Sequence, residues 1–225
     1  MRAVRTRLPG ITLRDGAAPD ADAVARLLSV VNPDDPGAFE DVRLNLGMPH
    51  EGPLSHSRSL VVLAEDAQGH PVGALFAGSP FWLFDHPVTG HPALLGDLVA
   101  RIGIISAVAV HPDHHGRGVG AELIRHAVRR FTRAGYGLLT LNCFPALEEY
   151  YDRLGFTIMD DLIVHLPDGR MAAPVWDDTR VAARPLDRHT VLAAVPGLGS
   201  PVVSGILPGS RVPDGAYFDG EKLHN

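Results

Sequence analysis

Apolar and polar residues follow two different periods along this chain, and the clearest change of period lies between residues 104 and 131. Ile104, Ile105, Val108 and Val110 are β-branched and apolar, which predicts a buried strand packed on both faces. Pro112 ends this strand, because proline cannot donate to a sheet ladder. From Val119 to Phe131 apolar residues recur at helical spacing opposite charged ones, which predicts an amphipathic helix. The order is therefore strand, tight turn and helix.

The same two patterns predict elements on both sides of this segment. Alternating or continuous apolar runs predict strands over residues 11–14, 59–64, 72–77, 138–144, 156–159, 162–166 and 171–176. Helical spacing predicts helices over residues 20–31, 38–48, 94–99, 146–154 and 185–195. Residues 196–215 are dense in Gly, Pro and Ser, and no function is inferred for them. Strands and helices thus mix along the chain, which is typical of an α/β or α+β domain.

Composition narrows the class of protein. The chain has 225 residues, 45% of them hydrophobic, and a single cysteine, which together predict a globular protein of a reducing, cytoplasmic environment. The basic N-terminus has no apolar run behind it, and no segment reaches a membrane-spanning length. A formal net charge of −6 argues against bulk nucleic-acid binding and favours cationic substrates. His111, His114 and His115 lie in a turn without a recognisable ligand spacing, so no metal site is predicted.

The turn before the amphipathic helix has the sequence His-Gly-Arg-Gly-Val-Gly over residues 115–120. Gly116 and Gly118 let the backbone turn sharply and bring its N–H groups close to a ligand. The following helix N-terminus adds free N–H groups and the positive end of the helix dipole, and Arg117 adds a full charge. These features predict a site for a phosphate or pyrophosphate.

Other nucleotide-binding motifs fit this turn less well. A P-loop would end in Gly-Lys-Ser or Gly-Lys-Thr, which is absent. Gly116, Gly118 and Ala121 match a dinucleotide fingerprint, but the next strand offers no acidic residue near its end. That fold would also need several further strand–helix units, which the chain does not supply.

From residue 108 to residue 156 the chain resembles the GCN5-related N-acetyltransferase (GNAT) family. The family signature Gln/Arg-x-x-Gly-x-Gly/Ala is matched by residues 115–120, with His115 in the first position. A strand follows, and then Tyr150-Tyr151-Asp-Arg-Leu-Gly-Phe, similar to the family's aromatic–Tyr pair before Gly-Phe. Residues 143–147, Cys-Phe-Pro-Ala-Leu, resemble the run that precedes this pair in one branch of the family.

The resemblance implies a mixed, mostly antiparallel central sheet flanked by helices, with strands splayed at the cofactor. It implies an N-acetyltransferase domain over residues 1–166, followed by a Pro/Gly-rich extension of unknown role over residues 167–225. It also implies that residues 38–48 line the acceptor side of the cleft. The connection over 78–101 is long and rich in aromatics, which predicts either an insert near the acceptor site or core packing of Phe81 and Trp82. The extension is expected to cover the domain, to be a loosely held tail or to pack on a second subunit in a homodimer.

The resemblance further implies acetyl-CoA as the donor and an amine, of a small molecule or a protein, as the acceptor. The residues implied to bind acetyl-CoA lie on the central strand, the glycine turn and the next strand: Val108, Ala109, Val110, His115, Gly116, Arg117, Gly118, Val119, Gly120, Ala121 and Asn142. A backbone N–H near Val110 would face the thioester oxygen, as in an oxyanion hole. Tyr151 would protonate the departing thiolate, because a phenol and a thiol have neighbouring pKa values. Tyr150 is expected in the core.

Two features depart from the family pattern. Many members carry an Asn where Phe144 stands, so Asn142 is the expected substitute. Many also place a Glu on the central strand as the general base, but here residues 104–107 hold no carboxylate. Ser106 could orient a water instead, and Asp85, His86, Asp97 and His111 remain open alternatives. The missing carboxylate keeps open a catalytically weak CoA-binding regulatory module, and the glycine turn keeps open a dinucleotide-binding oxidoreductase.

Overall fold

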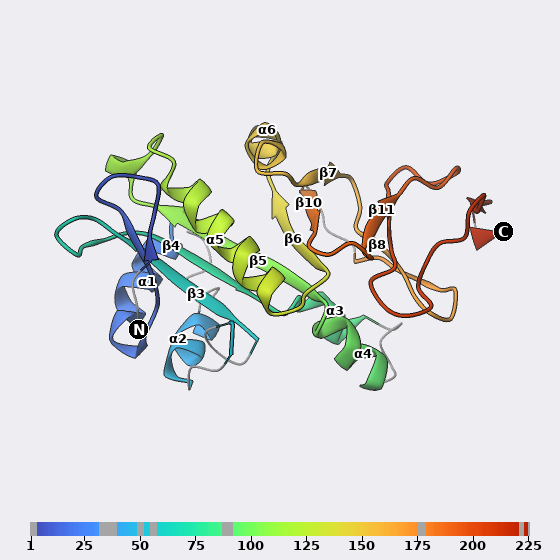
Figure 1. The fold of residues 1–225 in the computed structure, drawn as a ribbon, viewed down its shortest axis with the longest axis horizontal. Coiled ribbons are helices and arrows are strands. Elements are labelled where there is room, and N and C mark those ends of the chain that lie inside the picture. Colours follow the sequence, from blue (N-terminus) through green and yellow to red (C-terminus); the bar gives the residue numbers. More distant parts are fainter. Residues whose placement is uncertain are drawn as a thin grey trace. The chain divides into compact units, whose positions relative to one another are not determined.

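The computed structural model describes residues 4–31, 40–48, 52–54, 58–86, 92–174, 179–220 and 223–224 (Figure 1). The chain forms two compact units. The first contains Met1–Gly78 and Ile105–Ala134, and the second contains Ser79–Ile104 and Gly135–Asn225. Strand β5 (Ile102–Val110) passes from the second unit into the first.

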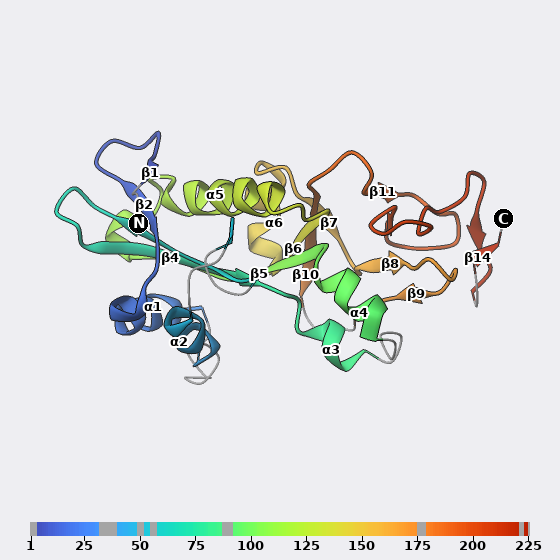
Figure 2. The ribbon, with the colours of Figure 1, turned by 60° about the horizontal axis from the view of Figure 1, so that its bottom comes forward.

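The first unit is a sheet covered by helices on both faces (Figure 2). Its strands are β1 (Val4–Arg5), β2 (Thr12–Asp15), β3 (Leu60–Glu65), β4 (Pro71–Gly78) and the later part of β5, in that order across the sheet. Strands β1 to β4 pair antiparallel with their neighbours. Helices α1 (Ala21–Leu28) and α2 (Glu40–Gly47) cover one face, and α5 (Val119–Arg133) covers the other.

A continuous apolar cluster joins α1 and α2 to the sheet. It consists of side chains that are nearly inaccessible to solvent: Val24, Leu28, Val42, Leu46, Val61, Leu63, Ala74, Phe76, Ala107 and Ala109. On the opposite face, Gly73 of β4 lets α5 approach closely, since a Cβ there would lie 3.2 Å from the side chain of Leu123. The sheet therefore fixes the position of α5 and of the turn that begins it.

A buried ion pair also holds α5 to the sheet. Arg130 Nη1 lies 2.6 Å from Asp15 Oδ1 at the end of β2, and the guanidinium also donates to the carbonyl of Pro53. His126, one turn earlier, has its Nε2 3.3 Å from Arg130 Nη1. Burial, followed by the nearby Arg130, lowers the pKa of His126 to about 4. His126 is therefore neutral at pH 7, so its Nε2 can accept a hydrogen bond from the arginine.

The second unit holds the other end of the main sheet. The start of β5 is followed by β6 (Leu138–Cys143), β10 (Arg180–Pro185) and β7 (Thr157–Met159). Strand β6 runs parallel to β5, with Ile102 opposite Leu138, whereas β10 pairs antiparallel with both β6 and β7. The sheet therefore includes a strand from beyond residue 166, where the sequence placed the end of the acetyltransferase domain.

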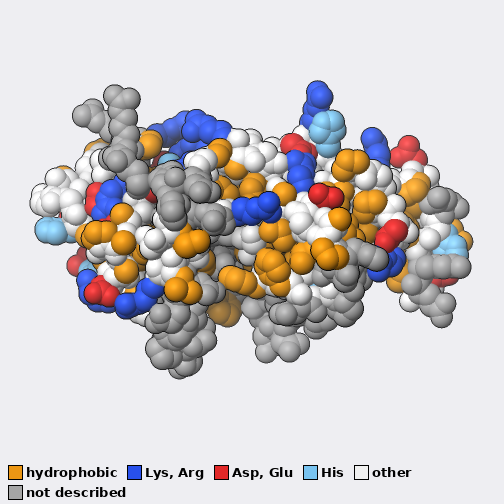
Figure 3. All heavy atoms as spheres, turned by 90° about the horizontal axis from the view of Figure 1, so that it is seen from below, with side chains coloured by type: hydrophobic (Ala, Val, Ile, Leu, Met, Phe, Trp, Pro, Cys, Tyr) orange, Lys and Arg blue, Asp and Glu red, His pale blue; other side chains and the backbone are white. Residues whose placement is uncertain are grey.

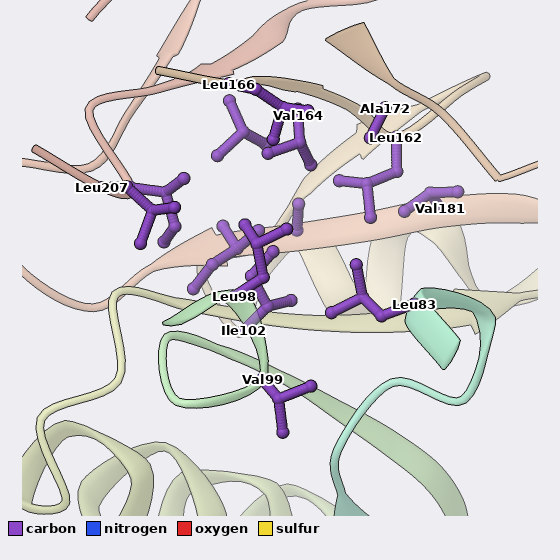
Figure 4. Packing of buried hydrophobic residues seen from close by; sticks show 14 of the residues in the cluster. Leu83, Leu98, Val99, Ile102, Leu162, Val164, Leu166, Ala172, Val181 and Leu207 are labelled. Atoms are coloured by element: carbon purple, nitrogen blue, oxygen red, sulfur yellow. The ribbon is translucent and has the colours of Figure 1, made fainter. Parts of the chain in front are cut away.

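The rest of the second unit surrounds this end of the sheet. A smaller sheet has the order β11 (Val191–Ala193), β12 (Val202–Ser204), β8 (Ile163–His165) and β9 (Met171–Ala172). A hairpin follows, formed by β13 (Tyr217–Phe218) and β14 (Leu223–His224). Helices α3 (Trp82–Asp85) and α4 (Pro92–Val99) contribute Leu83, Leu98 and Val99 to the apolar core shown in Figure 4.

The sequence predicted most of these elements and missed some details. The mixed, mostly antiparallel sheet flanked by helices is confirmed. The prediction of a helix over residues 185–195 is wrong, because Pro185 ends β10 and Val191–Ala193 forms β11, which pairs antiparallel with β12. In the turn between these strands, Asp187 Oδ1 accepts the backbone N–H groups of His189 and Thr190. Strand β5 is not packed on both faces: Ile105, Ala107 and Ala109 are buried, whereas Ser106 is exposed.

Both units expose some large apolar side chains. These are Val4, Val30, Val31, Leu44 and Met48 in the first unit and Phe81, Phe84, Phe144, Leu147, Val191 and Tyr217 in the second. Figure 3 shows apolar side chains spread among charged ones over one face of the molecule. The exposure of Val31 differs from the sequence prediction, because α1 ends at Leu28 before it reaches that residue.

Candidate active site

The turn between β5 and α5 has a backbone that only glycine adopts without strain. Pro112–His114 forms a short 3-10 helix, and Gly116 and Gly118 follow with φ angles of 70° and 84°. Gly118 is the N-cap of α5, and its carbonyl accepts the first intrahelical bond, from Glu122 N at 3.1 Å. The left-handed conformation at two alternate positions turns successive N–H groups toward one side of the loop.

The N–H groups of this loop are available to a ligand. The amides of Val119, Gly120 and Ala121 form the first turn of α5, where no intrahelical acceptor exists. Among the described residues, the N–H groups of Gly116, Arg117 and Gly118 have no acceptor either. The helix dipole adds partial positive charge, and Arg117 is exposed beside it. This arrangement suits a phosphate or pyrophosphate.

His115 is held against the strand that precedes the loop. Its Nε2 lies 2.7 Å from the carbonyl oxygen of Val110, and its backbone N–H donates to the carbonyl of Pro112 at 3.0 Å. The imidazole therefore closes the loop onto the end of β5. In this structure the side chain acts on the loop conformation, while the anion would meet the backbone.

One edge of strand β5 pairs with β4, and its opposite edge faces away from β4. His111 N donates to the carbonyl of Val72 on β4 at 2.8 Å. Because N–H groups alternate in direction along a strand, those of Val108 and Val110 point to the opposite edge. This edge leads directly to the glycine loop. The first unit thus places the residues expected on the central strand and on the loop next to one another along one continuous backbone.

Tyr151 and Asn142 lie in the second unit. Tyr151 is on α6 (Glu148–Asp152), is 9% exposed, and packs edge-on against Tyr150 and Phe156. Burial, then the nearby Tyr150 and Cys143, raises the pKa of Tyr151 to about 12. Its phenol therefore carries its proton at neutral pH. Tyr150 is the more exposed of the pair, contrary to the expectation that it would be the core residue.

Helix α6 is held in place by a residue that the sequence analysis did not single out. Arg180, at the start of β10, has its Nη1 2.6 Å from Asp160 and its Nε 3.6 Å from Glu148, the first residue of α6. Its strand partner is Cys143, the last residue of β6. No local sequence signal connects residue 180 with residue 148, because their proximity depends on the insertion of β10 beside β6.

Asn142 and Phe144 stand at the end of β6. Asn142 is exposed and lies opposite Val181 of β10 in the strand register. Phe144 is 62% exposed, so it does not belong to the core. Asn142 is therefore accessible to solvent.

The candidates for a general base belong to different units of the chain. Ser106 is exposed on β5 in the first unit, whereas Asp97 is exposed on α4 in the second. His86 packs edge-on against Trp82, with its Nε2 3.3 Å from the carbonyl of Ala173. His111 is exposed, and its Nδ1 accepts a long hydrogen bond of 3.4 Å from the backbone N–H of Asp113. The side chain of Asp85 falls outside the described part of the chain.

Two broader properties of the described residues bear on the chemistry. They contain no group of three His, Cys, Asp or Glu side chains that could hold a metal ion. None of their helices is both long enough and apolar enough to span a bilayer.

Comparison with known proteins decides what kind of domain this is. Residues 56–158 match the acetyltransferase (GNAT) domain family. The chain carries a GNAT acetyltransferase domain. The matched stretch includes the glycine loop, Asn142 and α6, and it identifies the protein as an acyltransferase.

Solved structures of this family share the fold. A GNAT family N-acetyltransferase from Escherichia coli in complex with CoA has a TM-score of 0.55 at 18% identity, over 83% of this chain and 86% of its own. A GNAT phosphinothricin acetyltransferase from Sinorhizobium meliloti in complex with acetyl-CoA has a TM-score of 0.53 at 20% identity, over 78% and 88%. A GCN5-related N-acetyltransferase from Kribbella flavida gives 0.52 at 19%, over 78% and 98%. At these identities the likeness concerns the fold.

Proposed function

We propose that this GNAT acetyltransferase transfers an acetyl group from acetyl-CoA to an amine by direct attack within a ternary complex. The observation that supports acetyl-CoA most strongly is the row of N–H groups from Gly116 to Ala121 that have no acceptor among the described residues. They suit the pyrophosphate of the donor, and Arg117 adds charge beside it. Acetyl-CoA and CoA are present in two of the similar solved structures.

Strand β5 would hold the rest of the donor through its backbone. The N–H groups of Val108 and Val110 point away from β4 and are placed to bond an extended amide-containing arm, with Ala109 between them. The Val110 N–H would stabilise negative charge on the thioester oxygen. The exposed amide of Asn142 would bond the same arm from β6. Orienting donor and amine together supplies much of the rate acceleration.

Tyr151 would supply the proton that the leaving thiolate needs. Its raised pKa keeps it protonated at the working pH, but it also makes the phenol a weaker acid. Burial would raise the pKa of the CoA thiol as well, because a dry site disfavours the charged form of both the phenol and the thiol. Transfer between the two therefore remains feasible. Ser106, exposed on β5, would orient the water that removes the proton from the amine.

A thermal-shift titration tests the donor. The protein is titrated with acetyl-CoA, NADH and ATP in separate experiments, and a ligand at one hundred times its Kd should stabilise it by about 2.7 kcal/mol. We expect a saturable shift with acetyl-CoA and none of comparable size with NADH or ATP. A larger shift with NADH would refute the donor assignment and support a dinucleotide-dependent enzyme.

The acceptor is tested by release of free thiol from acetyl-CoA. The panel contains small-molecule amines, phosphinothricin and peptides with free N-terminal or lysine amines, with each amine's N-acetylated form as its control. We expect thiol release only with a free amine. Donor binding without thiol release for any amine would favour a CoA-binding regulatory module. Light scattering with and without acetyl-CoA tests the proposed homodimer.

A further inference from the structure

A cavity of about 550 Å³ lies in the second unit, and nine of its ten lining residues come from the stretch between residues 188 and 211. Its lining combines basic, apolar and glycine residues: Arg101, Arg188, His189, Val191, Gly205, Ile206, Leu207, Pro208, Gly209 and Arg211. None of these described residues is acidic, although the chain as a whole has a formal net charge of −6. The cavity is therefore a local concentration of positive charge.

Two interlocked turns fix the walls of this cavity. Asp187 accepts the backbone N–H groups of His189 and Thr190 at 2.9 and 2.8 Å, which shapes the first turn. Gly205 has a φ of 76°, and a Cβ there would lie 2.3 Å from the carbonyl oxygen of His189. Only glycine allows this approach. Ser210 closes the second turn by bonding the backbone of Leu207 in both directions, at 2.9 Å each.

The arginines of the cavity play two different roles. Arg101 pairs with Asp187 and donates to the carbonyl oxygens of Ile206 and Gly135, so its charge is already neutralised. Arg188 and Arg211 are exposed, and neither has an ion-pair partner among the described residues. Arg188 donates only to the ring of His189, at 3.2 Å. Two guanidinium groups are thus left to face a ligand.

We propose that this cavity binds a small organic anion with a phosphate or carboxylate group and a compact apolar body. Guanidinium groups bind both kinds of anion through paired, charge-assisted hydrogen bonds. The apolar side chains of Val191, Ile206 and Leu207 would take the body, and the volume lies within the range of small-molecule sites. The proposal gives the C-terminal segment a binding function of its own. It does not depend on acetyl transfer, because none of the residues that line the cavity is among those proposed to bind acetyl-CoA or to protonate the thiolate.

Calorimetric titration of the full-length protein with phenyl phosphate and with benzoate tests the proposal. The two probes share an apolar ring and differ in the anion, so they distinguish a phosphate site from a carboxylate site. We expect saturable binding of at least one probe. Arg188→Ala and Arg211→Ala should each weaken it about tenfold, as expected for the loss of one charge-assisted hydrogen bond. The double variant should abolish it.

Arg26→Ala is the matched control. Arg26 is exposed on α1 in the first unit, so its removal changes the net charge equally without touching the cavity. Binding should be unchanged in this variant, and also in wild type saturated with CoA. Equal affinity in wild type and the double variant, no binding of either probe, or full displacement by CoA would each overturn the proposal. If the wild-type protein binds a probe but not CoA, the anion cavity is supported and only the assignment of acetyl-CoA as the acetyl donor is refuted.

Discussion

The two units offer ligands different kinds of groups. In the first unit, the residues from Val108 to Ala121 present backbone N–H groups, and the side chain of His115 acts on the loop itself. In the second unit the corresponding groups are side chains: the phenol of Tyr151 and the guanidinium groups of Arg188 and Arg211. A backbone site resists most substitutions but depends on glycine conformation. A side-chain site can be removed one residue at a time.

Removal of the Tyr151 hydroxyl should have the largest effect. A general acid contributes about 10²- to 10⁴-fold to a rate, so Tyr151→Phe should lower kcat by that factor and leave the KM for acetyl-CoA nearly unchanged. Because burial raises the pKa of Tyr151 to about 12, the wild-type rate should not fall as pH rises through 10 on account of this group. Thiol-release kinetics between pH 6 and pH 10.5 would measure both effects.

Tyr150→Phe provides the control for this change. Tyr150 contacts Tyr151 edge-on with a centroid separation of 5.1 Å, but it is the more exposed of the two rings. Its variant should keep kcat within a few-fold of wild type. Equal activity of Tyr151→Phe and wild type would show that the buried ring has only a packing role and would remove the second unit's part in proton transfer.

A bulky residue at Gly118 should have the next largest effect, on donor affinity. With a φ of 84° at this position, valine is strained by about 1–2 kcal/mol. Relaxation of the strain would turn the first amides of α5 away from the pyrophosphate. We expect Gly118→Val to raise the Kd for acetyl-CoA about 30-fold, a free-energy change of about 2 kcal/mol, measured by calorimetry.

Gly169→Val separates backbone strain from loss of the site. Gly169 has a φ of 83° in the turn between β8 and β9, and a Cβ there would meet no other atom within 4 Å. This variant should lose similar stability but bind acetyl-CoA like wild type. If both valine variants bound the donor normally, the glycine loop would not be the pyrophosphate site.

The contrast between a site made of backbone groups and a site made of side chains also explains what could be predicted from the sequence. Gly116 and Gly118 are read directly from the chain, because their conformational freedom is a local property and they lie between a strand pattern and a helix pattern. Arg180 and Arg211 could not be assigned a role in this way. Arg180 meets Glu148 only because β10 lies beside β6, and Arg211 faces Arg188 across two turns that meet through Gly205. Long-range pairing of this kind leaves no local pattern.

Tertiary context also overrode local patterns within the predicted elements. The apolar spacing over 185–195 suggested a helix, but Val191–Ala193 pairs antiparallel with β12, and the sheet takes the N–H and C=O groups that a helix would use. The β-branched run in β5 suggested burial on both faces. Helices α1 and α2 cover only one of these faces, with Ala107 and Ala109 in the cluster, and Ser106 remains exposed on the other.

The smallest expected effect concerns His126, whose side chain supports the glycine loop's helix without reaching a ligand. Its pKa is lowered to about 4 from an unfolded value near 6.5, so the unfolded chain takes up the proton first as pH falls. The stability linked to this group is fully present above pH 6.5 and is lost as pH falls from 6.5 toward 4. The loss at pH 5 is about 2 kcal/mol. His126→Gln should remove this part of the pH dependence in urea unfolding at pH 7 and pH 5.

His70→Gln is the control for His126→Gln, since His70 is exposed in the β3–β4 hairpin. An unchanged difference between the two pH values in His126→Gln would show that the burial of neutral His126 does not cause this acid sensitivity.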